Sequence, residues 1–210
     1  MSVDHPRVLL VTDSRRLVPG AAIDARLHAL ERQAREAFAA GVDAVQIRER
    51  DLDGAALFDL TRAIAALGRV VVTDRVDVAV AAGASGVHLR ADGPEPARVR
   101  PLLAPGMTLS RAVHDAAEAA RFGGDAALDW LIAGPAFETE SKPGRAPLGP
   151  DGVRTIARAS RLPVVAIGGV TPANARDLLA AGAAGVAAIG LFLSPPARED
   201  VDSLRDRSLE

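Results

Sequence analysis

The sequence contains no cysteine and no tyrosine, and aromatic residues make up only 3% of its 210 residues. The lack of cysteine excludes disulfides, thiolate nucleophiles and metal sites built on cysteine. The scarcity of aromatic rings argues against a nucleic-acid-binding protein, because such proteins stack bases on aromatic side chains. The net charge of −2 likewise provides no basic surface for nucleic acid or an anionic membrane.

Long uninterrupted apolar runs are also missing, and the N-terminal segment lacks the pattern of a secretory signal. We therefore expect a cytoplasmic protein without a membrane partner. Apolar residues at 49% and charged residues at 25% are ordinary for a globular chain. The length suits one large domain, which we expect to span residues 1–210.

Short runs rich in valine and isoleucine alternate along the chain with longer segments of helical periodicity. The expected strands are Val8–Val11, Ala44–Ile47, Val70–Thr73, Gly86–Leu89, Thr108–Ser110, Trp130–Ile132, Val164–Ile167 and Gly185–Ile189. The expected helices are Ala22–Ala40, Gly54–Leu67, Arg75–Ala82, Glu95–Leu103, Asp115–Phe122, Pro150–Ala159, Asn174–Ala181 and Arg198–Arg205. Strands that are apolar throughout are typical of a parallel sheet covered on both faces. Eight such units predict an α/β fold, a (β/α)8 TIM barrel, with a doubly wound open sheet as the alternative.

Polar residues collect directly after the expected strands, where the active site of a barrel lies. Gln46 and Arg48 share one face of their strand by the two-residue period, so both can point to the barrel mouth. His114 follows a strand and precedes a helix, which suits a general acid or base that titrates near neutral pH. His88 lies within a strand, where an interior hydrogen-bonded role and a catalytic role are equally compatible with the sequence.

Lys142 is the only lysine, against 24 arginines, and it lies in a glycine-bounded loop after an apolar run. An ammonium is a point charge suited to phosphate or to proton chemistry, although a solvated surface lysine is the alternative. Gly168 and Gly169 lead from a strand into a helix, so backbone N–H groups there can receive phosphate oxygens, and Gly190 can complete the site. A simple tight turn is the alternative interpretation of the glycine pair.

Several of these segments resemble the thiamine phosphate synthase superfamily, which includes the thiazole tautomerases. The resemblance extends from Leu9 to about Phe192. Its motifs are Val45-Gln46-Ile47-Arg48-Glu49-Arg50, Thr73-Asp74-Arg75-Val76-Asp77-Val78-Ala79, Gly86-Val87-His88-Leu89, the 134–142 loop and Ala166-Ile167-Gly168-Gly169-Val170. The resemblance implies a (β/α)8 barrel without an obligatory organic cofactor, and a homo-oligomer by the habit of the family.

The resemblance leaves two enzymes open. Synthases join a pyrimidine diphosphate to a thiazole phosphate, and Mg2+ holds the departing diphosphate. Their pattern has Asn-Asp-Arg after strand three and a metal-binding aspartate shortly after His-Leu-Gly. Here Thr73 replaces the asparagine, Arg90-Ala91-Asp92-Gly93 disrupts the second region, and Ala112 and Gly190 stand where synthases have serine. These departures count against the synthase.

Ser110-Arg111-Ala112-Val113-His114 and Phe137-Glu138-Thr139 look like the tautomerase branch, which aromatises a thiazole carboxylate phosphate by proton transfer and requires no cofactor. We therefore favour a thiazole tautomerase with His114, Lys142 and Arg48 as catalytic residues. The expected substrate-binding residues are Gln46, Arg50, Thr73, Asp74, Arg111, Thr139, Gly168, Gly169 and Gly190. The alternatives are a synthase, in which Asp74 binds Mg2+, and a non-catalytic barrel that binds a phosphorylated ligand.

Overall fold

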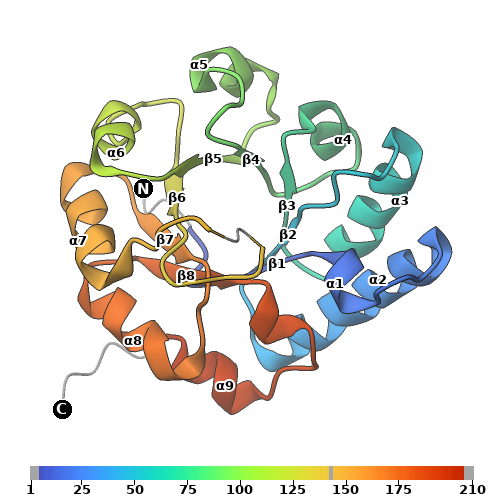
Figure 1. Cartoon of the computed structure of the whole chain (residues 1–210). Coiled ribbons are helices and arrows are strands. Elements are labelled where there is room, and N and C mark those ends of the chain that lie inside the picture. The colour runs from blue at the N-terminus through green and yellow to red at the C-terminus, as the bar shows by residue number, and fades with distance from the viewer. Residues whose placement is uncertain (1–4, 142–143, 206–210) are drawn as a thin grey trace.

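Eight parallel strands close into a barrel in the computed structural model, which describes residues 5–141 and 144–205 (Figure 1). The strands are β1 (Val8–Val11), β2 (Ala44–Ile47), β3 (Val70–Thr73), β4 (Gly86–Leu89), β5 (Thr108–Val113), β6 (Trp130–Ala133), β7 (Val164–Ile167) and β8 (Gly185–Ala188). Each strand pairs with the next along the chain, and β8 pairs with β1. The predicted (β/α)8 barrel is confirmed, and the open sheet is wrong.

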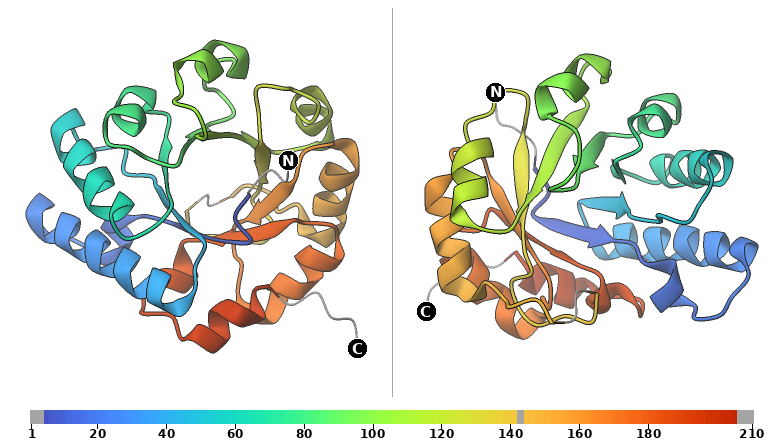
Figure 2. Two further views of the ribbon diagram at one scale, coloured as in Figure 1. Left: turned by 180° about the vertical axis from the view of Figure 1, so that it is seen from behind. Right: turned by 45° about the horizontal axis from the view of Figure 1, so that its top comes forward.

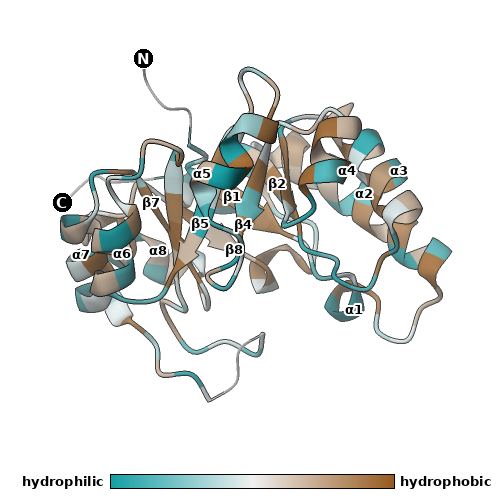
Figure 3. Cartoon of the chain, turned by 90° about the horizontal axis from the view of Figure 1, so that it is seen from above, coloured by the Kyte–Doolittle hydropathy of each residue, from teal (hydrophilic) through white to brown (hydrophobic). Residues whose placement is uncertain are grey.

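The strands are apolar along their whole length because both of their faces are buried. Leu9 and Val11 of β1 point into the barrel, where a small interior core surrounds Trp130. Val8 and Leu10 point outward and join the larger core between the strands and the helices. Successive side chains of a strand point to opposite faces, so a barrel with two cores needs continuous apolar runs. Figure 3 shows these apolar strands in the middle of the molecule.

Helices surround the barrel on all sides (Figures 1 and 2). They are α1 (Ser14–Leu17), α2 (Ile23–Ala40), α3 (Gly54–Ala65), α4 (Val76–Ala81), α5 (Pro96–Val99), η1 (Arg100–Leu102), α6 (Ala116–Phe122), α7 (Gly149–Ala159), α8 (Pro172–Ala180), η2 (Gly190–Phe192) and α9 (Arg198–Ser203). None of the helices in the described residues combines the length and the apolar character needed to cross a lipid bilayer.

Apart from the short η2 and shifts of one or two residues at other ends, three elements differ from the expected ones. The single turn α1 was not predicted, because four residues are too few to show a period; the carboxylate of Asp13 caps it by accepting a hydrogen bond from the backbone N–H of Arg16. The expected helix 95–103 ends as an α-helix at Val99, since Pro101 lacks an N–H group for the helical ladder. Strand β5 continues beyond its expected end at Ser110, through Arg111, to Val113.

Candidate active site

A central cavity of about 390 Å³ lies at the carboxyl ends of the strands. We use the name central cavity for the space whose polar lining consists of Gln46, Arg48, Arg50, Thr73, His88, Arg90, Asp92, His114, Thr139, Ser141 and Arg145. Its apolar lining includes Val11, Ile132 and Ile189, which close the barrel interior. The loop between β6 and α7 passes across this mouth (Figure 1). The structure thus brings most of the predicted site residues together in one space.

The segment Arg48-Glu49-Arg50 follows β2 and sends its side chains in two directions. Arg48 and Arg50 line the central cavity, whereas Glu49 is buried beneath them. The carboxylate of Glu49 accepts hydrogen bonds from the Ser14 backbone N–H (3.0 Å) and from the Ser14 hydroxyl (2.5 Å). Arg26 donates to the Ser14 hydroxyl and lies 3.5 Å from Glu49. This buried network fixes the backbone that presents the two cavity arginines.

Asp51 anchors the outer end of the same network. Its carboxylate accepts two hydrogen bonds from Arg26, at 2.7 and 3.0 Å. The hydrogen bond with Arg26 holds the pKa of Asp51 well below its ordinary value of 3.8.

We expect Asp51→Asn to lower the free energy of unfolding at pH 7 by about 1 kcal/mol, a modest value because the side chain is 30% exposed. A depressed carboxylate pKa stabilises the fold above the unfolded pKa, and this stabilisation is lost as the pH falls toward the folded pKa. The difference between wild type and Asp51→Asn should therefore shrink below about pH 4. Denaturation curves recorded from pH 7 to pH 2 measure it, and a constant difference would contradict the pairing.

Arg48 is a partly buried cation whose side chain forms no ion pair with any carboxylate of the described residues. Burial first, and then the charge of Arg50, lowers the pKa of Arg48 below its ordinary value. A guanidinium nevertheless remains protonated in proteins. Two neighbouring cations at the barrel mouth therefore repel each other, and an anion bound there would relieve that repulsion.

Gln46 and Thr73 lie side by side on β2 and β3. The Gln46 amide nitrogen donates to the Thr73 hydroxyl at 3.0 Å. The amide oxygen of Gln46 is buried and finds no hydrogen-bond partner among the described residues. Because a buried acceptor without a partner is unfavourable, this oxygen is suited to receive an N–H or O–H group of a ligand.

Asp74 lies outside the central cavity, in a smaller hollow of about 240 Å³ that Arg48, Arg50 and Arg90 also line. One oxygen of its carboxylate accepts from the backbone N–H of Arg90 at 3.1 Å, and the other accepts from the guanidinium of Arg90. Asp92 lies 3.6 Å from the same guanidinium. The hydrogen bond with Asp74 raises the pKa of Arg90, which is therefore a permanent cation.

These carboxylates do not fit the Mg2+ of the synthase interpretation. Magnesium is held by carboxylate oxygens and water. The two oxygens of Asp74 already accept hydrogen bonds from Arg90, and Asp92 faces the same cation. Across residues 5–141 and 144–205, no cluster of three or more histidine, aspartate or glutamate side chains is arranged to hold a metal ion.

Both histidines of the barrel mouth line the central cavity. His114 follows β5, and its Nδ1 lies 3.2 Å from a carboxylate oxygen of Glu118, which also accepts from the His114 backbone N–H. A carboxylate at Nδ1 orients an imidazole for proton transfer. His88 is buried, lies 3.0 Å from the Ser110 hydroxyl through Nδ1, and stacks on Trp130. Its surroundings are those of an interior residue at the edge of the cavity.

A second space, which we call the glycine pocket, adjoins the central cavity. It measures about 400 Å³, and its lining includes Arg16, Glu138, Glu140, Gly168, Gly169, Thr171 and Gly190. Helix α8 begins there, but its first residue, Pro172, has no N–H group and the Thr171 N–H donates to the Asn174 side chain, so the glycine backbone is the candidate to receive an anion. Both spaces share their walls at Thr139, Ser141, Ile167, Gly168 and Ile189.

The glycine pair in this pocket is required by the backbone. Gly168 and Gly169 have φ values of +106° and +64°, in the region that favours glycine. A Cβ atom on Gly168 would lie 2.9 Å from Pro135, and one on Gly169 would lie 2.5 Å from the carbonyl oxygen of Glu138. The pair therefore lets the loop after β6 approach the strand end closely, which brings the two spaces into contact.

Besides Asp74, two predicted residues are not among the described residues that line either space. Arg111 lines neither space: it is buried, lies over the Phe122 ring at 4.3 Å, and donates hydrogen bonds to the carbonyls of Pro94 and Ala91. It holds the loop after β4. Lys142 lies outside the described residues, although Thr139 earlier in the same loop lines both spaces.

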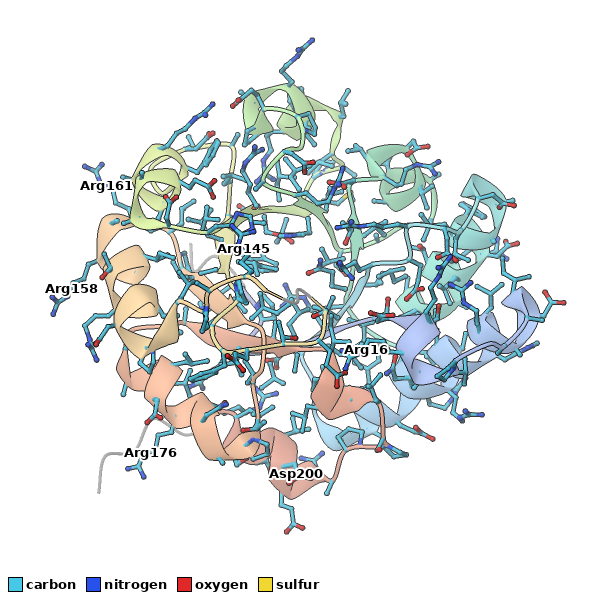
Figure 4. All side chains as sticks on the ribbon, viewed as in Figure 1. Arg16, Arg145, Arg158, Arg161, Arg176 and Asp200 are labelled. Atoms are coloured by element: carbon cyan, nitrogen blue, oxygen red, sulfur yellow. The ribbon has the colours of Figure 1, made fainter. Side chains whose placement is uncertain are left out.

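Three arginines at the mouth were not among the predicted site residues. Arg90 directly follows β4, a position that the strand-end rule could have singled out. Arg145 belongs to the loop before α7, and Arg16 belongs to the unpredicted α1; both lie toward the barrel mouth in Figure 4, unlike Arg158 and Arg161 at the periphery. The guanidinium of Arg16 also forms an ion pair with Glu140 at 2.6 Å.

Comparison with known proteins identifies the family to which the chain is similar. Residues 11–192 match the family model described as thiamine monophosphate synthase. The chain is 40% identical over 166 residues to a putative thiamine-phosphate synthase of Geobacter sulfurreducens, a match that covers 76% of this chain and 78% of the relative. It is 39% identical over 181 residues to a thiamine-phosphate synthase of Methanoculleus marisnigri, with 83% and 85% covered.

Among solved structures, the chain is similar to a thiamine phosphate pyrophosphorylase from Pyrococcus furiosus. The TM-score is 0.78 at 29% sequence identity, and the match covers 95% of this chain and 93% of the other.

Proposed function

Since this chain belongs to the thiamine monophosphate synthase family, we propose that it is a transferase that joins a pyrimidine diphosphate to a thiazole phosphate. A bond between carbon and a diphosphate oxygen breaks, and the same carbon forms a bond to the thiazole. The diphosphate leaves with the electron pair of the broken bond, so negative charge develops on its oxygens. Fixed cations at that position stabilise the departing group.

The observation that supports this proposal most directly is the contact between two anion-binding spaces of different chemistry. The central cavity offers guanidinium groups, and the glycine pocket offers the backbone of Gly168, Gly169 and Gly190 together with Arg16. A synthase binds one substrate with a diphosphate and one with a single phosphate. The shared wall at Gly168 would bring the two reacting ends together, which is the main contribution that positioning makes to a two-substrate reaction.

The sequence favoured a thiazole tautomerase, whereas the names of the relatives support its alternative, the synthase. A specific observation keeps the tautomerase as a second candidate. His114 lines the central cavity, and Glu118 faces its Nδ1, which is the arrangement of an imidazole that carries a proton. A tautomerase needs such a proton carrier and a site for only one phosphate. No observation specifically favours the third interpretation, a non-catalytic barrel that binds a phosphorylated ligand.

One assay distinguishes the two enzymes. We expect the purified protein to form thiamine phosphate from the pyrimidine diphosphate and the thiazole phosphate, measured by liquid chromatography. We expect His114→Ala to keep synthase turnover within about tenfold of wild type, because that reaction is dominated by charge neutralisation. The exposed Arg158, on the outer side of α7, supplies an Arg158→Ala control that should leave turnover unchanged.

The opposite result supports the tautomerase. If the protein isomerises a non-aromatic thiazole carboxylate phosphate and forms no thiamine phosphate, the synthase proposal is wrong. In that case His114→Ala should slow proton exchange by about 10²–10⁴-fold, the usual contribution of a general acid or base. Exchange of deuterium from solvent into the substrate, followed by nuclear magnetic resonance, measures this loss.

A further inference from the structure

We propose that Arg90 serves as a built-in counter-cation for the diphosphate, in the position where Asp74 and Asp92 would otherwise hold a divalent metal ion. The inference rests on the proposed function for the identity of the anion. It rests on the geometry of Arg90 for the replacement of the metal.

Arg90 holds both acidic residues at once. It bonds to Asp74 through its backbone N–H and its guanidinium, and it lies 3.6 Å from Asp92. Asp74 has a φ of +61°, a conformation that residues other than glycine rarely adopt, so its carboxylate is held toward Arg90 against a local backbone preference. The pairing is therefore a built feature of the strand ends.

The loop that carries Arg90 is held in place by hydrogen bonds from Arg111. Arg111 donates hydrogen bonds to the carbonyl oxygens of Ala91 and Pro94, at 2.6 and 2.8 Å. This buried arginine braces the segment between Arg90 and α5, so the Arg90 guanidinium is presented at a defined place. Arg111 is thus a positioning residue, because it affects the Arg90 guanidinium only by holding this loop.

Arg90 still faces the ligand while it holds Asp74. Its side chain is 40% exposed, and it lines the central cavity together with Arg48 and Arg50. A guanidinium has five donor N–H groups in a planar fork, so one edge can bond a carboxylate while another bonds phosphate oxygens. The same ion therefore satisfies the acidic residues and contributes positive charge to the anion site, which are the two roles of a bridging metal.

Two binding measurements test this inference without turnover. In the presence of a chelator, isothermal titration calorimetry with inorganic pyrophosphate should detect binding to the wild-type protein. Arg90→Ala should weaken this binding by about tenfold to a hundredfold, the range for a lost charge-assisted contact. Arg158→Ala is the matched control and should bind pyrophosphate as wild type does.

Electron paramagnetic resonance of free Mn2+ supplies the second readout. Wild type should not take up the ion, whereas Arg90→Ala should, because the carboxylates of Asp74 and Asp92 are released. Arg90→Lys keeps a cation and should exclude Mn2+, which covers the case that the alanine variant folds poorly. Asp74→Asn should retain metal-free pyrophosphate binding, since it leaves Arg90 in place.

The inference is overturned if wild type binds Mn2+ as tightly as Arg90→Ala does. It is equally overturned if pyrophosphate binding requires a divalent ion, or is unchanged by Arg90→Ala. Neither readout depends on product formation. A protein that forms no thiamine phosphate but binds pyrophosphate through Arg90 would refute the synthase proposal alone.

Discussion

Replacing Trp130 by alanine is expected to lower the free energy of unfolding by about 3–5 kcal/mol, the range for a large aromatic side chain removed from a core. Trp130 is completely buried on β6 and is the largest side chain of the core inside the barrel. The same interior core includes the small side chains of Ala44 and Ala187, which cannot fill the space that Trp130 would leave. The loss would also remove the ring on which His88 stacks.

Trp130→Phe separates the contribution of ring packing to stability from the contribution of the indole nitrogen. The nitrogen of Trp130 has no hydrogen-bond partner among the described residues, so phenylalanine forfeits no hydrogen bond and should destabilise clearly less than alanine. Leu102→Ala, at a leucine that is 61% exposed, is the surface control. Chemical denaturation followed by circular dichroism is the suitable measurement, because the variants lack the only tryptophan. A loss below about 1 kcal/mol for Trp130→Ala would contradict the close packing of the barrel interior.

Replacing Arg48 by alanine is expected to lower kcat/KM by about 10–150-fold, which corresponds to the roughly 1.5–3 kcal/mol of a hydrogen bond to a charged group. The same variant should keep its thermal stability or gain slightly. Arg48 is a partly buried cation beside Arg50, without an ion pair among the described carboxylates, so its removal relieves desolvation and repulsion in the free protein. A functional charge that is unfavourable for folding gives this combination of effects.

Steady-state kinetics together with thermal melts check both halves of the Arg48 prediction. Arg161→Ala removes an exposed arginine from the periphery of the barrel and should change neither quantity (Figure 4). If Arg48→Ala lowers stability and leaves kcat/KM unchanged, Arg48 is a structural residue and the arginine-lined cavity does not bind the anion as described.

The barrel could be predicted from the sequence because its signals are local. Continuous apolar runs between helical segments indicate parallel strands with two buried faces, and this pattern located all eight strands to within a few residues. The same rule gave the mouth residues, since every parallel strand ends at the same rim. For this reason Arg48, Arg50, Thr73 and His114 were expected at the cavity that they line.

Only the tertiary structure decided which of these charges pair with one another. Arg111 was expected at the substrate, but its position in β5 points it outward to Phe122 and the loop after β4. Arg90 and Asp74 are 16 positions apart and meet because β3 and β4 are neighbours in the barrel. Strand periodicity fixes the face on which a side chain lies, whereas ion pairing depends on distances across strands that a linear pattern does not contain. The sequence by itself therefore determined the barrel and its polar rim, and the packing of neighbouring strands determined that the guanidinium of Arg90 pairs with the carboxylate of Asp74.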